Sequence, residues 1–471
     1  KKTFAVGHGC AASWDFNAFE RVDHVSSDFL PEYNQPVTSH AVKKDDQEIK
    51  VSMRKLAGLD ENNDGRNELK LLVESYRARI KGLSDYDQRS PPIDKKLFDT
   101  ADGLTEKCKQ CLARIEDGID FLYGDSEDSK KALLAFKYSN YAMLLGQLKG
   151  NRDIREPNDN GEYGPIDDIN PSEELPNIGY WRPFQIAFFL MTLRSMTESD
   201  TNSDREIVDL IWFPTGGGKT EAYLGLAAFT IFYNRLSKKS YESTDVIMRY
   251  TLRLLTTQQF ERASLLMCAM EYLRRNNEEK LGEKRFLIGM LVGGASTPNT
   301  RQDAKTKLKR FKKRISYDED RNPNPFNLLK CPWCSAKMGR VRVGKGEGNF
   351  GKYEVRGYYE GSFDNGNNDQ SVCYECPDNK CDFGPKGGRG SNRGRLPIIN
   401  IDEDLYESPP NLMIGTVDKM ALIAWKPQMR SIFGLDDMGE RTDIPPSLII
   451  QDELHLISGP LGSMVGAYES I

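Results

Sequence analysis

The sequence Pro-Thr-Gly-Gly-Gly-Lys-Thr, residues 214–220, constrains the fold of this chain more than any other segment. The apolar run Ile207 to Phe213 precedes it and predicts a strand, whereas Glu221 to Ala228 follows it and predicts a helix. A glycine-rich turn between a strand and a helix directs backbone N–H groups and the positive end of the helix dipole at one point. The segment therefore predicts a phosphate-binding loop in an α/β fold.

The residues of this phosphate loop have separate expected roles. Lys219 is expected to reach the β- and γ-phosphates of ATP, and Thr220 to place its hydroxyl on Mg²⁺. One departure is that Phe213 stands where the usual pattern has a small residue. A glycine-rich turn that binds nothing is the alternative, but it does not explain the Gly-Lys-Thr or the flanking elements. The loop residues that we predict to hold the nucleotide are Thr215, Gly216, Gly217, Gly218, Lys219 and Thr220.

A second apolar strand is predicted for Ser447 to Gln451, and it ends in the acidic box Asp452-Glu453-Leu454-His455. Ligands of open α/β sheets bind at the carboxyl ends of strands. Asp452 is the candidate holder of Mg²⁺, and Glu453 is the candidate base that activates the attacking water. Read alone, the box could equally begin a solvated helix. The preceding strand and the phosphate loop favour the catalytic interpretation. The predicted catalytic residues are Lys219, Asp452, Glu453 and His455.

Short apolar segments alternate with helical ones over much of the chain, which predicts a parallel sheet with helices on both faces. The further strands are predicted at 246–250, 286–292 and 412–415. At about 100 to 200 residues per domain, 471 residues imply two or three units. The units that we expect are a mainly helical N-terminal domain at 1–175, a split α/β lobe at 176–300 and 400–471, and a basic insertion at 301–399.

Composition excludes some classes of protein. A hydrophobic fraction of 38% and a charged fraction of 29% suit a soluble globular protein. No apolar run approaches the roughly 20 residues that span a bilayer, and the first residues turn polar too soon for a signal peptide. We therefore expect a cytoplasmic protein without a membrane partner. The net charge of −5 argues neither for nor against a nucleic-acid partner, because a motor needs only a local basic track.

The insertion carries two pairs of cysteines about forty residues apart. Such pairs on tight turns are typical of a four-thiolate zinc ribbon, and a closed site of this kind is structural. Cys373 leaves the second pair ambiguous, although Phe383 favours the choice of Cys376 with Cys381. Basic runs flank the module and either hold DNA phosphates or form a solvated face. The predicted zinc ligands are Cys331, Cys334, Cys376 and Cys381.

Together these motifs resemble the first RecA-like lobe of superfamily 2 helicases. The resemblance implies that Gln185, near Arg182, reads the adenine edge of ATP, although a helix cap with Gln185 on a solvated face is the alternative. Three later segments resemble strand-tracking motifs: 251–259, 292–294 and 415–419. Each segment alone has an ordinary interpretation as a strand end or cap, and their order makes them informative. The residues that we predict to contact DNA are Arg253, Thr257, Gln258, Gly293, Gly294, Thr416 and Lys419.

Within this superfamily, the longer strings at 212–224 and 450–462 look like the DrmA family, helicase-like proteins of the bacterial DISARM anti-phage system. The resemblance implies a DNA-binding ATPase in phage defence that works with a DrmB-like protein and a DNA methyltransferase. Such a motor needs a second RecA-like lobe, which supplies an arginine to the transition state. Too little sequence follows His455 for that lobe, so we expect this chain alone to bind ATP weakly and to hydrolyse it slowly.

Three hypotheses about function follow from these features. The first is an ATP-dependent DNA helicase or translocase that uses ATP, Mg²⁺ and a structural Zn²⁺. The second is a nucleotide-switched DNA-binding scaffold without unwinding activity. The third is a phosphoryl-transfer enzyme for a small substrate, which leaves the cysteine module and the tracking motifs unexplained.

Overall fold

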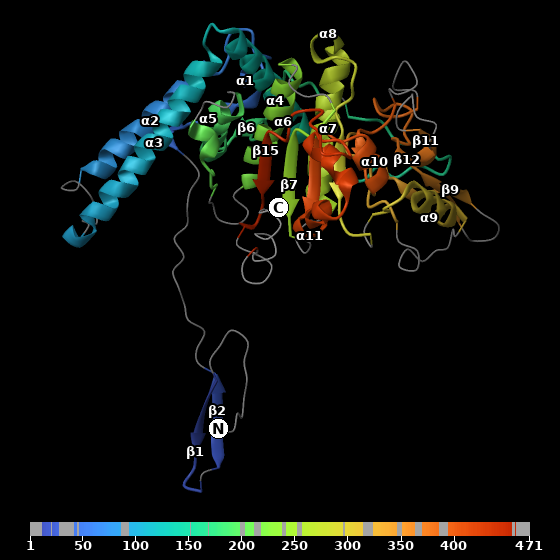
Figure 1. The fold of residues 1–471 in the computed structure, drawn as a ribbon, viewed down its shortest axis with the longest axis horizontal. Helices are drawn as coiled ribbons and strands as arrows, with labels where there is room; N and C mark the ends of the chain where they lie inside the picture. Colours follow the sequence, from blue (N-terminus) through green and yellow to red (C-terminus); the bar gives the residue numbers. More distant parts are fainter. Residues whose placement is uncertain are drawn as a thin grey trace. The chain divides into compact units, whose positions relative to one another are not determined.

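The chain forms two compact units, Lys1–His40 and Ala41–Ile471, in a computed structural model. The first unit contains an antiparallel hairpin of β1 (Ala12–Phe16) and β2 (Val22–Ser27), which Figure 1 shows in blue. The structure describes residues 12–19, 21–27, 42–44, 47–85, 94–150, 152–167, 169–197, 203–211, 218–237, 242–251, 257–294, 297–313, 324–345, 351–362, 370–385, 394–454 and 457.

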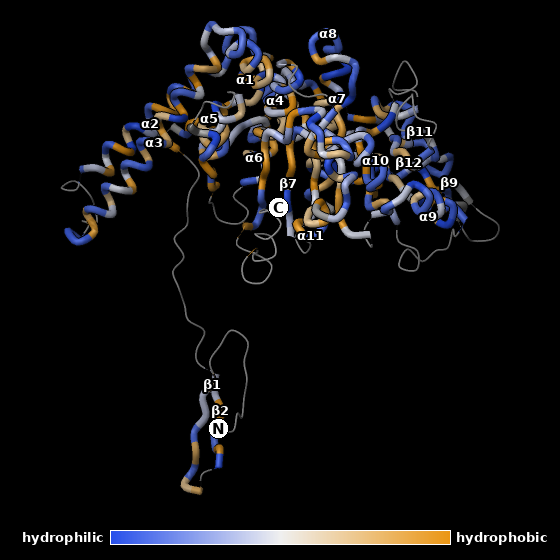
Figure 2. The backbone as a smooth tube through the Cα atoms, viewed as in Figure 1, coloured by the Kyte–Doolittle hydropathy of each residue, from blue (hydrophilic) through white to orange (hydrophobic). Residues whose placement is uncertain are grey.

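A five-stranded parallel sheet organises the second unit, with the strand order β13-β8-β14-β7-β15 (Figure 1). Leu412 of the middle strand lies opposite both Val246 and Ile288 in the ladder. Most of these strand residues are buried and apolar, because helices cover both faces of the sheet. Figure 2 shows the apolar character of β7. The strands are β7 (Val246–Tyr250), β8 (Ile288–Leu291), β13 (Ile398–Ile399), β14 (Leu412–Thr416) and β15 (Leu448–Gln451).

The α/β fold predicted from sequence is therefore confirmed, and the arrangement is consistent with a RecA-like lobe. Predicted strands 246–250, 286–292, 412–415 and 447–451 correspond to β7, β8, β14 and β15. Successive residues of each strand point to opposite faces. Val246 and Met248 face the larger core, whereas Ile247 faces a smaller one on the other side.

One predicted strand is wrong in its described part. Residues 207–211 are irregular and follow the short helix η2 (Ser203–Glu206), and the remainder of the predicted strand lies outside the described residues. Val208 is 92% exposed, so the apolar run is not buried against a sheet neighbour. Arg114 instead holds Asp209 through two hydrogen bonds of 2.6 and 2.9 Å. An apolar run specifies a strand only where a neighbouring strand pairs with it, and the sequence pattern does not identify that neighbour.

Helices from the first 150 residues pack directly on the helices that cover the sheet. The rings of Phe136, Phe189 and Phe229, from three different helices, meet edge to face with centroids 5.3 and 5.7 Å apart. Gly118 allows the helix at 98–122 to touch the helix at 183–197 closely, because an added Cβ would lie 2.2 Å from the carbonyl oxygen of Leu190. These helices are α2 (Arg66–Ser84), α3 (Phe98–Leu122), α4 (Glu127–Gly150), α5 (Pro183–Thr197), α6 (Lys219–Leu236) and α7 (Thr257–Asn276).

The opposite face of the sheet is covered by short helices that follow the insertion. Ile247, Leu291 and Met413 from the sheet pack with Met429 and Ile432 in this smaller core. The covering elements are α10 (Asp402–Glu407), α11 (Val417–Met420), η4 (Ala421–Ala424) and η5 (Pro427–Phe433).

The described residues of the insertion form one helix and two antiparallel hairpins. They are α9 (Arg301–Lys313), β9 (Gly339–Lys345) with β10 (Gly351–Arg356), and β11 (Tyr358–Ser362) with β12 (Gln370–Tyr374). The remaining elements are β3 (Lys43–Lys44), β4 (Gln47–Glu48), β5 (Val51–Ser52), α1 (Met53–Leu56), η1 (Lys95–Leu97), β6 (Tyr180–Trp181) and α8 (Glu278–Leu281). Among the described helices, none has the length and apolar character that crossing a membrane requires.

Candidate nucleotide site and cysteine centre

The start of α6 and the end of β15 meet through one tyrosine. The hydroxyl of Tyr223 donates a hydrogen bond of 2.7 Å to Oδ2 of Asp452. The same hydroxyl lies 3.1 Å from Oγ1 of Thr220, one helical turn earlier. Because a phenol has one proton, Thr220 donates to the tyrosine oxygen while the tyrosine donates to the carboxylate. The structure thus brings together Thr220 and Asp452, the two residues that the sequence proposes for Mg²⁺.

The second oxygen of Asp452 is also held. Its Oδ1 accepts a hydrogen bond of 2.9 Å from the backbone N–H of Glu453. Glu453 has φ 49°, a left-handed conformation that costs a non-glycine residue about 1 kcal/mol or more. The strained backbone thereby places an N–H beside the carboxylate.

A neighbouring strand fixes the position of the acidic box. The backbone N–H of Asp452 donates to the carbonyl of Arg249 at 3.1 Å, which extends the pairing of β15 with β7 by one residue. The side chain of Arg249 donates through Nε to Oε1 of Gln451 at 2.9 Å. In return, the Gln451 amide donates to the Arg249 carbonyl at 3.2 Å. These contacts hold the strand end on which the candidate catalytic residues stand.

Gln185 approaches the phosphate loop from α5. Its Nε2 donates to the carbonyl of Gly218 at 2.7 Å, and its Oε1 accepts from the backbone N–H of Arg182 at 2.9 Å. Gly218 has φ +86°, and a Cβ there would lie 2.8 Å from Nε2 of Gln185. Only glycine permits both this conformation and this approach. The buried Gln185 side chain therefore contacts the loop, so the expectation of a solvated face is wrong. The bond from the Arg182 N–H does cap the start of α5, as the helix-cap alternative expected.

Some predicted site residues lie outside the described residues. They are Thr215, Gly216, Gly217, Arg253 and His455, together with the side chain of Thr257. Lys219 begins α6, where the helix dipole favours an anion. Glu221, in the first turn of the same helix, forms an ion pair with Arg262 of α7. This ion pair connects α6 to α7 near the loop.

The donor set fits a magnesium ion bound with a nucleotide. Thr220 offers a hydroxyl oxygen and Asp452 a carboxylate, and both touch the hydroxyl of Tyr223. Mg²⁺ prefers such oxygen ligands and usually keeps several waters. Burial raises the pKa of Tyr223 far above its ordinary value, so this phenol remains a protonated donor.

The described DNA-contact candidates gather at the carboxyl ends of β8 and β14. Gly293 and Gly294 follow β8, and a Cβ on Gly294 would lie 2.7 Å from Nδ2 of Asn299. Asn299 in turn accepts a hydrogen bond of 3.1 Å from Nζ of Lys419. The motifs that follow β8 and β14 therefore lie at the same edge of the sheet. Gln258 is an exposed residue in the first turn of α7, which follows β7.

Two of these candidates are buried. Thr416 ends β14, and Lys419 is only 7% exposed and lies 2.7 Å from Asp402. Burial raises the pKa of Asp402, whereas the ammonium of Lys419 opposes that rise. A phosphate contact by Lys419 would have to compete with this carboxylate. The sequence did not indicate the pairing, because Asp402 and Lys419 lie on two different short helices, α10 and α11, and periodicity does not predict how these helices pack.

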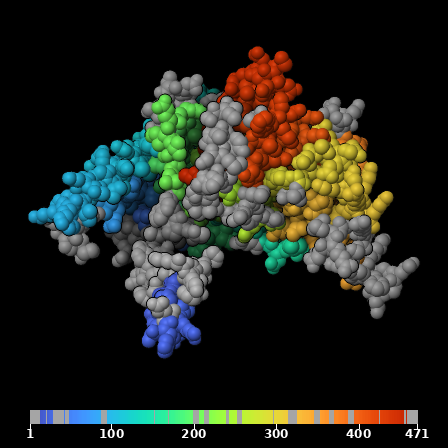
Figure 3. Space-filling model, turned by 60° about the horizontal axis from the view of Figure 1, so that its bottom comes forward, coloured from blue at the N-terminus to red at the C-terminus, as the bar shows by residue number. Residues whose placement is uncertain are grey.

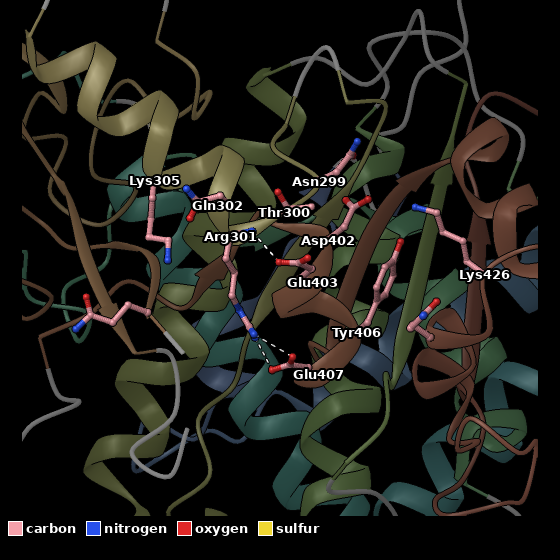
Figure 4. Close-up of a pocket in the computed structure, with 12 residues that line it drawn as sticks. Asn299, Thr300, Arg301, Gln302, Lys305, Asp402, Glu403, Tyr406, Glu407 and Lys426 are labelled. Atoms are coloured by element: carbon pink, nitrogen blue, oxygen red, sulfur yellow. Dashed lines mark hydrogen bonds and ion pairs between the residues drawn. The ribbon is translucent and has the colours of Figure 1, made fainter. Parts of the chain in front are cut away.

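A cavity of about 710 Å³ opens beside this edge, between the start of α9 and the helices after the insertion (Figure 4). Arg301 points toward Glu407 and, through its Nε, donates to Asp404 at 2.7 Å. Lys305 and Lys426 enter the lining from opposite sides. Figure 3 shows residues near 300 beside residues beyond 400 on this face of the molecule. The cavity is thus lined by both ends of the insertion.

Four cysteines of the insertion form a buried cluster. One ligand atom from each of Cys331, Cys334, Cys376 and Cys381 lies within 4.8 Å of the others. Burial and then the neighbouring thiols raise the pKa of Cys331. Thiols this close and this buried suit a cation that stabilises four thiolates, and the set matches the ligands of a structural zinc site. Cys373 stands outside the cluster, and its thiol donates to the carbonyl of Gly361 at 3.5 Å.

The cysteine cluster is attached to the helices that support the sheet. Trp333, between the first two cysteines, packs against Tyr272 of α7 with ring centroids 5.2 Å apart. The ammonium of Lys149, at the end of α4, lies 4.3 Å from the Trp333 ring centroid. Arg155 donates to the Cys334 carbonyl at 3.1 Å and to Asp378 at 2.8 Å. The cluster therefore joins the insertion to α4 and α7.

Sequence reasoning missed Tyr223 as a site residue. A signal was available, because Tyr223 follows Thr220 by three positions in a predicted helix and so lies on the same face. Asn299 carried no comparable signal, since its contact with Lys419 joins residues 120 positions apart. Asp402 carried none because it lies on a different helix from Lys419.

Comparison with known proteins agrees with these motifs. No protein-family model matches the chain. The DISARM protein DrmA of Bacillus paralicheniformis is 30% identical over 509 aligned residues, which include all of this chain. The chain spans 41% of that relative's length. The similarity to this DISARM protein therefore extends along the whole of this chain.

Proposed function

We propose that this chain is the ATP-binding half of a DNA-dependent motor ATPase in a DISARM-type anti-phage defence system. The observation that carries the proposal is the hydrogen-bonded connection from Thr220 through Tyr223 to Asp452. It joins the end of the phosphate loop to the acidic box, which are separated by more than two hundred residues in the sequence. The similarity to a DISARM protein supports the defence role.

The proposed chemistry divides among four residues. Lys219 at the N-terminus of α6 would bind the phosphates of ATP, where the helix dipole also favours negative charge. Thr220 and Asp452 would hold Mg²⁺, which neutralises charge on the phosphates when it is bound. Glu453 would orient and activate the attacking water. His455, in the same acidic box, is a further candidate catalytic residue.

Completion of the site requires a second RecA-like lobe, because phosphoryl transfer of this class uses an arginine that contacts the γ-phosphate. The chain spans 41% of its DrmA relative, so that protein has room for such a lobe. We therefore propose that this half alone turns over ATP slowly.

DNA is the proposed substrate track. The sheet edge that carries Gly293, Gly294 and Thr416 adjoins the cavity lined by Lys305 and Lys426. Glycines permit a close approach of the phosphate backbone, and lysines release counterions from it. A DrmB-like protein and a DNA methyltransferase are the proposed partners, on the basis of the resemblance to a DISARM protein.

The alternative is a nucleotide-switched scaffold that binds DNA without unwinding it. The burial of Lys419 against Asp402 favours the scaffold, because a residue that was expected to contact DNA is already paired with a carboxylate. The cysteine cluster has a structural role under both proposals, the motor and the scaffold, since four cysteine ligands leave no open position on a metal for chemistry.

The test is ATP turnover by the full-length protein with and without single-stranded DNA, beside Glu453→Gln and a strand-displacement assay. Stimulation by DNA together with displacement, both absent in Glu453→Gln, supports the motor. DNA binding and ATP turnover without displacement support the scaffold. ATP turnover that DNA does not affect would contradict both and favour a phosphoryl-transfer enzyme.

A further inference from the structure

Tyr223 occupies the point where the two candidate magnesium ligands meet. Its hydroxyl touches Thr220 Oγ1 at 3.1 Å and Asp452 Oδ2 at 2.7 Å, and its ring is buried in the large core. The side chain stands one turn into α6, a helix of 18 residues whose interior packs against the sheet. Tyr223 is therefore held by the fold and does not depend on a ligand for its position.

The hydrogen-bond directions matter for a cation. When the Thr220 proton points at the tyrosine oxygen, the lone pairs of Thr220 are left for a metal. The tyrosine proton engages Oδ2 of Asp452, and the backbone N–H of Glu453 engages Oδ1 at 2.9 Å. Both oxygens of this carboxylate are thus oriented before any ion arrives, and each keeps a further lone pair.

We infer that Tyr223 is a positioning residue that sets the spacing and the proton directions of Thr220 and Asp452 for Mg²⁺. The inference rests on the proposed function, because it concerns the same magnesium site. It adds a residue outside the phosphate loop and the acidic box. Preorganised ligands bind more tightly, since the cost of ordering them has been met in the folded chain.

Tyr223→Phe tests the inference because it removes only the hydroxyl oxygen. Binding of a fluorescent ATP analogue to the full-length protein is titrated with MgCl₂ and, separately, measured in EDTA. Loss of a hydrogen bond to a charged group is expected to raise the half-saturating Mg²⁺ concentration about tenfold. Affinity for the analogue in EDTA is expected to stay unchanged, because the proposed role of Tyr223 is to orient the magnesium ligands Thr220 and Asp452.

Tyr233→Phe is the matched control. Tyr233 lies on the same helix, is equally buried, and donates to the carbonyl of Thr197 at 3.1 Å, away from the acidic box. It is expected to leave the magnesium titration unchanged. General damage from Tyr223→Phe would lower the affinity in EDTA as well, so that arm separates misfolding from a specific effect.

Two results overturn the inference while leaving the proposed function intact. They are an unaltered magnesium titration in Tyr223→Phe, and a lower half-saturating Mg²⁺ concentration, which would mean that the hydroxyl competes with the ion. A wild-type protein that binds the analogue without any response to MgCl₂ would count against the proposed function, and the inference would fall with it.

Discussion

The side-chain amide of Gln185 donates a hydrogen bond to the backbone carbonyl of Gly218 across 2.7 Å. Gly218 immediately precedes Lys219 and is held in a left-handed conformation. Gln185, the candidate contact for adenine, therefore also holds the backbone of the phosphate loop in place. Each end of the Gln185 amide can still form one more hydrogen bond, so support of the loop and contact with adenine are compatible.

Gln185→Ala should therefore weaken ATP binding for two reasons. Loss of the loop contact is expected to lower ATP affinity about tenfold, since buried hydrogen bonds contribute on the order of 1 kcal/mol and an unsatisfied carbonyl adds to the loss. Loss of the adenine contact is expected to abolish the preference for ATP over GTP. Competition binding of both nucleotides to the full-length protein measures both effects. A preserved ATP preference would show that Gln185 supports the loop without reading the base.

Gln147→Ala provides the comparison. The Gln147 amide oxygen accepts a hydrogen bond of 2.8 Å from the backbone N–H of Gly179, far in sequence from the phosphate loop. Gln147→Ala, like Gln185→Ala, removes a side-chain amide that forms a hydrogen bond with a glycine backbone. It is expected to leave the affinity for ATP unaltered.

The cysteine cluster predicts one zinc ion per chain. Cys334→Ser removes a ligand and is expected to abolish stoichiometric zinc and to lower the free energy of unfolding by about 3 kcal/mol or more. Cys373→Ser is the control, because Cys373 lies outside the cluster and bonds to Gly361. Elemental analysis of the purified proteins with chemical denaturation checks both. Zinc retained in Cys334→Ser, or lost in Cys373→Ser, would show that the ligand set is wrong.

Asp245 predicts a dependence of stability on pH. It precedes β7, accepts hydrogen bonds from Asn234 and Asn411 at 2.7 and 2.8 Å, and burial raises its pKa to about 6. The pKa in the unfolded chain is about 4, so the folded chain holds the proton longer. The stability that this proton provides is complete below about pH 4 and is lost as pH rises through about 6.

The expected contribution is roughly 3 kcal/mol of unfolding free energy, because the pKa of Asp245 is about two units higher in the folded chain than in the unfolded chain. Urea denaturation at a series of pH values measures it, with Asp245→Asn as the variant that cannot titrate. The fall in stability between about pH 4 and pH 6 should be smaller in the variant. Equal pH profiles for the two proteins would exclude Asp245 as the titrating group.

The ion pair of Arg114 with Asp209 predicts a further contribution to stability. Both side chains are mostly buried, and two hydrogen bonds join them. Arg114→Ala is expected to cost about 1 to 3 kcal/mol, as for a hydrogen-bonded charge. Arg77→Ala removes an exposed pair with Glu116 and is expected to cost less than about 1 kcal/mol. Equal costs in chemical denaturation would mean that Arg114 does not anchor the segment before the phosphate loop.

Local patterns predicted most of the sheet and the cysteine cluster. The strands β7, β8, β14 and β15 were recognisable because apolar runs between helices are typical of a parallel sheet. Cys331 and Cys334 were recognisable because the spacing of metal ligands is a local property. In both cases the information lies within a few neighbouring residues.

Contacts between distant segments were not predictable in the same way. The run at 207–211 looked like a strand, but Asp209 pairs with Arg114 of a helix. Lys419 looked like a phosphate contact, but its ammonium donates a hydrogen bond to Asn299, 120 positions earlier in the chain. Pairing of side chains far apart in sequence depends on the tertiary fold, which periodicity and spacing do not encode.

Binding of ATP to the full-length protein, compared with Lys219→Ala, tests the central claim most directly. The account predicts magnesium-dependent binding by the wild type. It also predicts a loss of affinity of at least about tenfold in Lys219→Ala, because the proposed role of this ammonium is to pair with the phosphates. Binding does not depend on turnover, so the result does not require the second lobe to be active. Equal affinity in the two proteins would contradict the assignment of the phosphate loop.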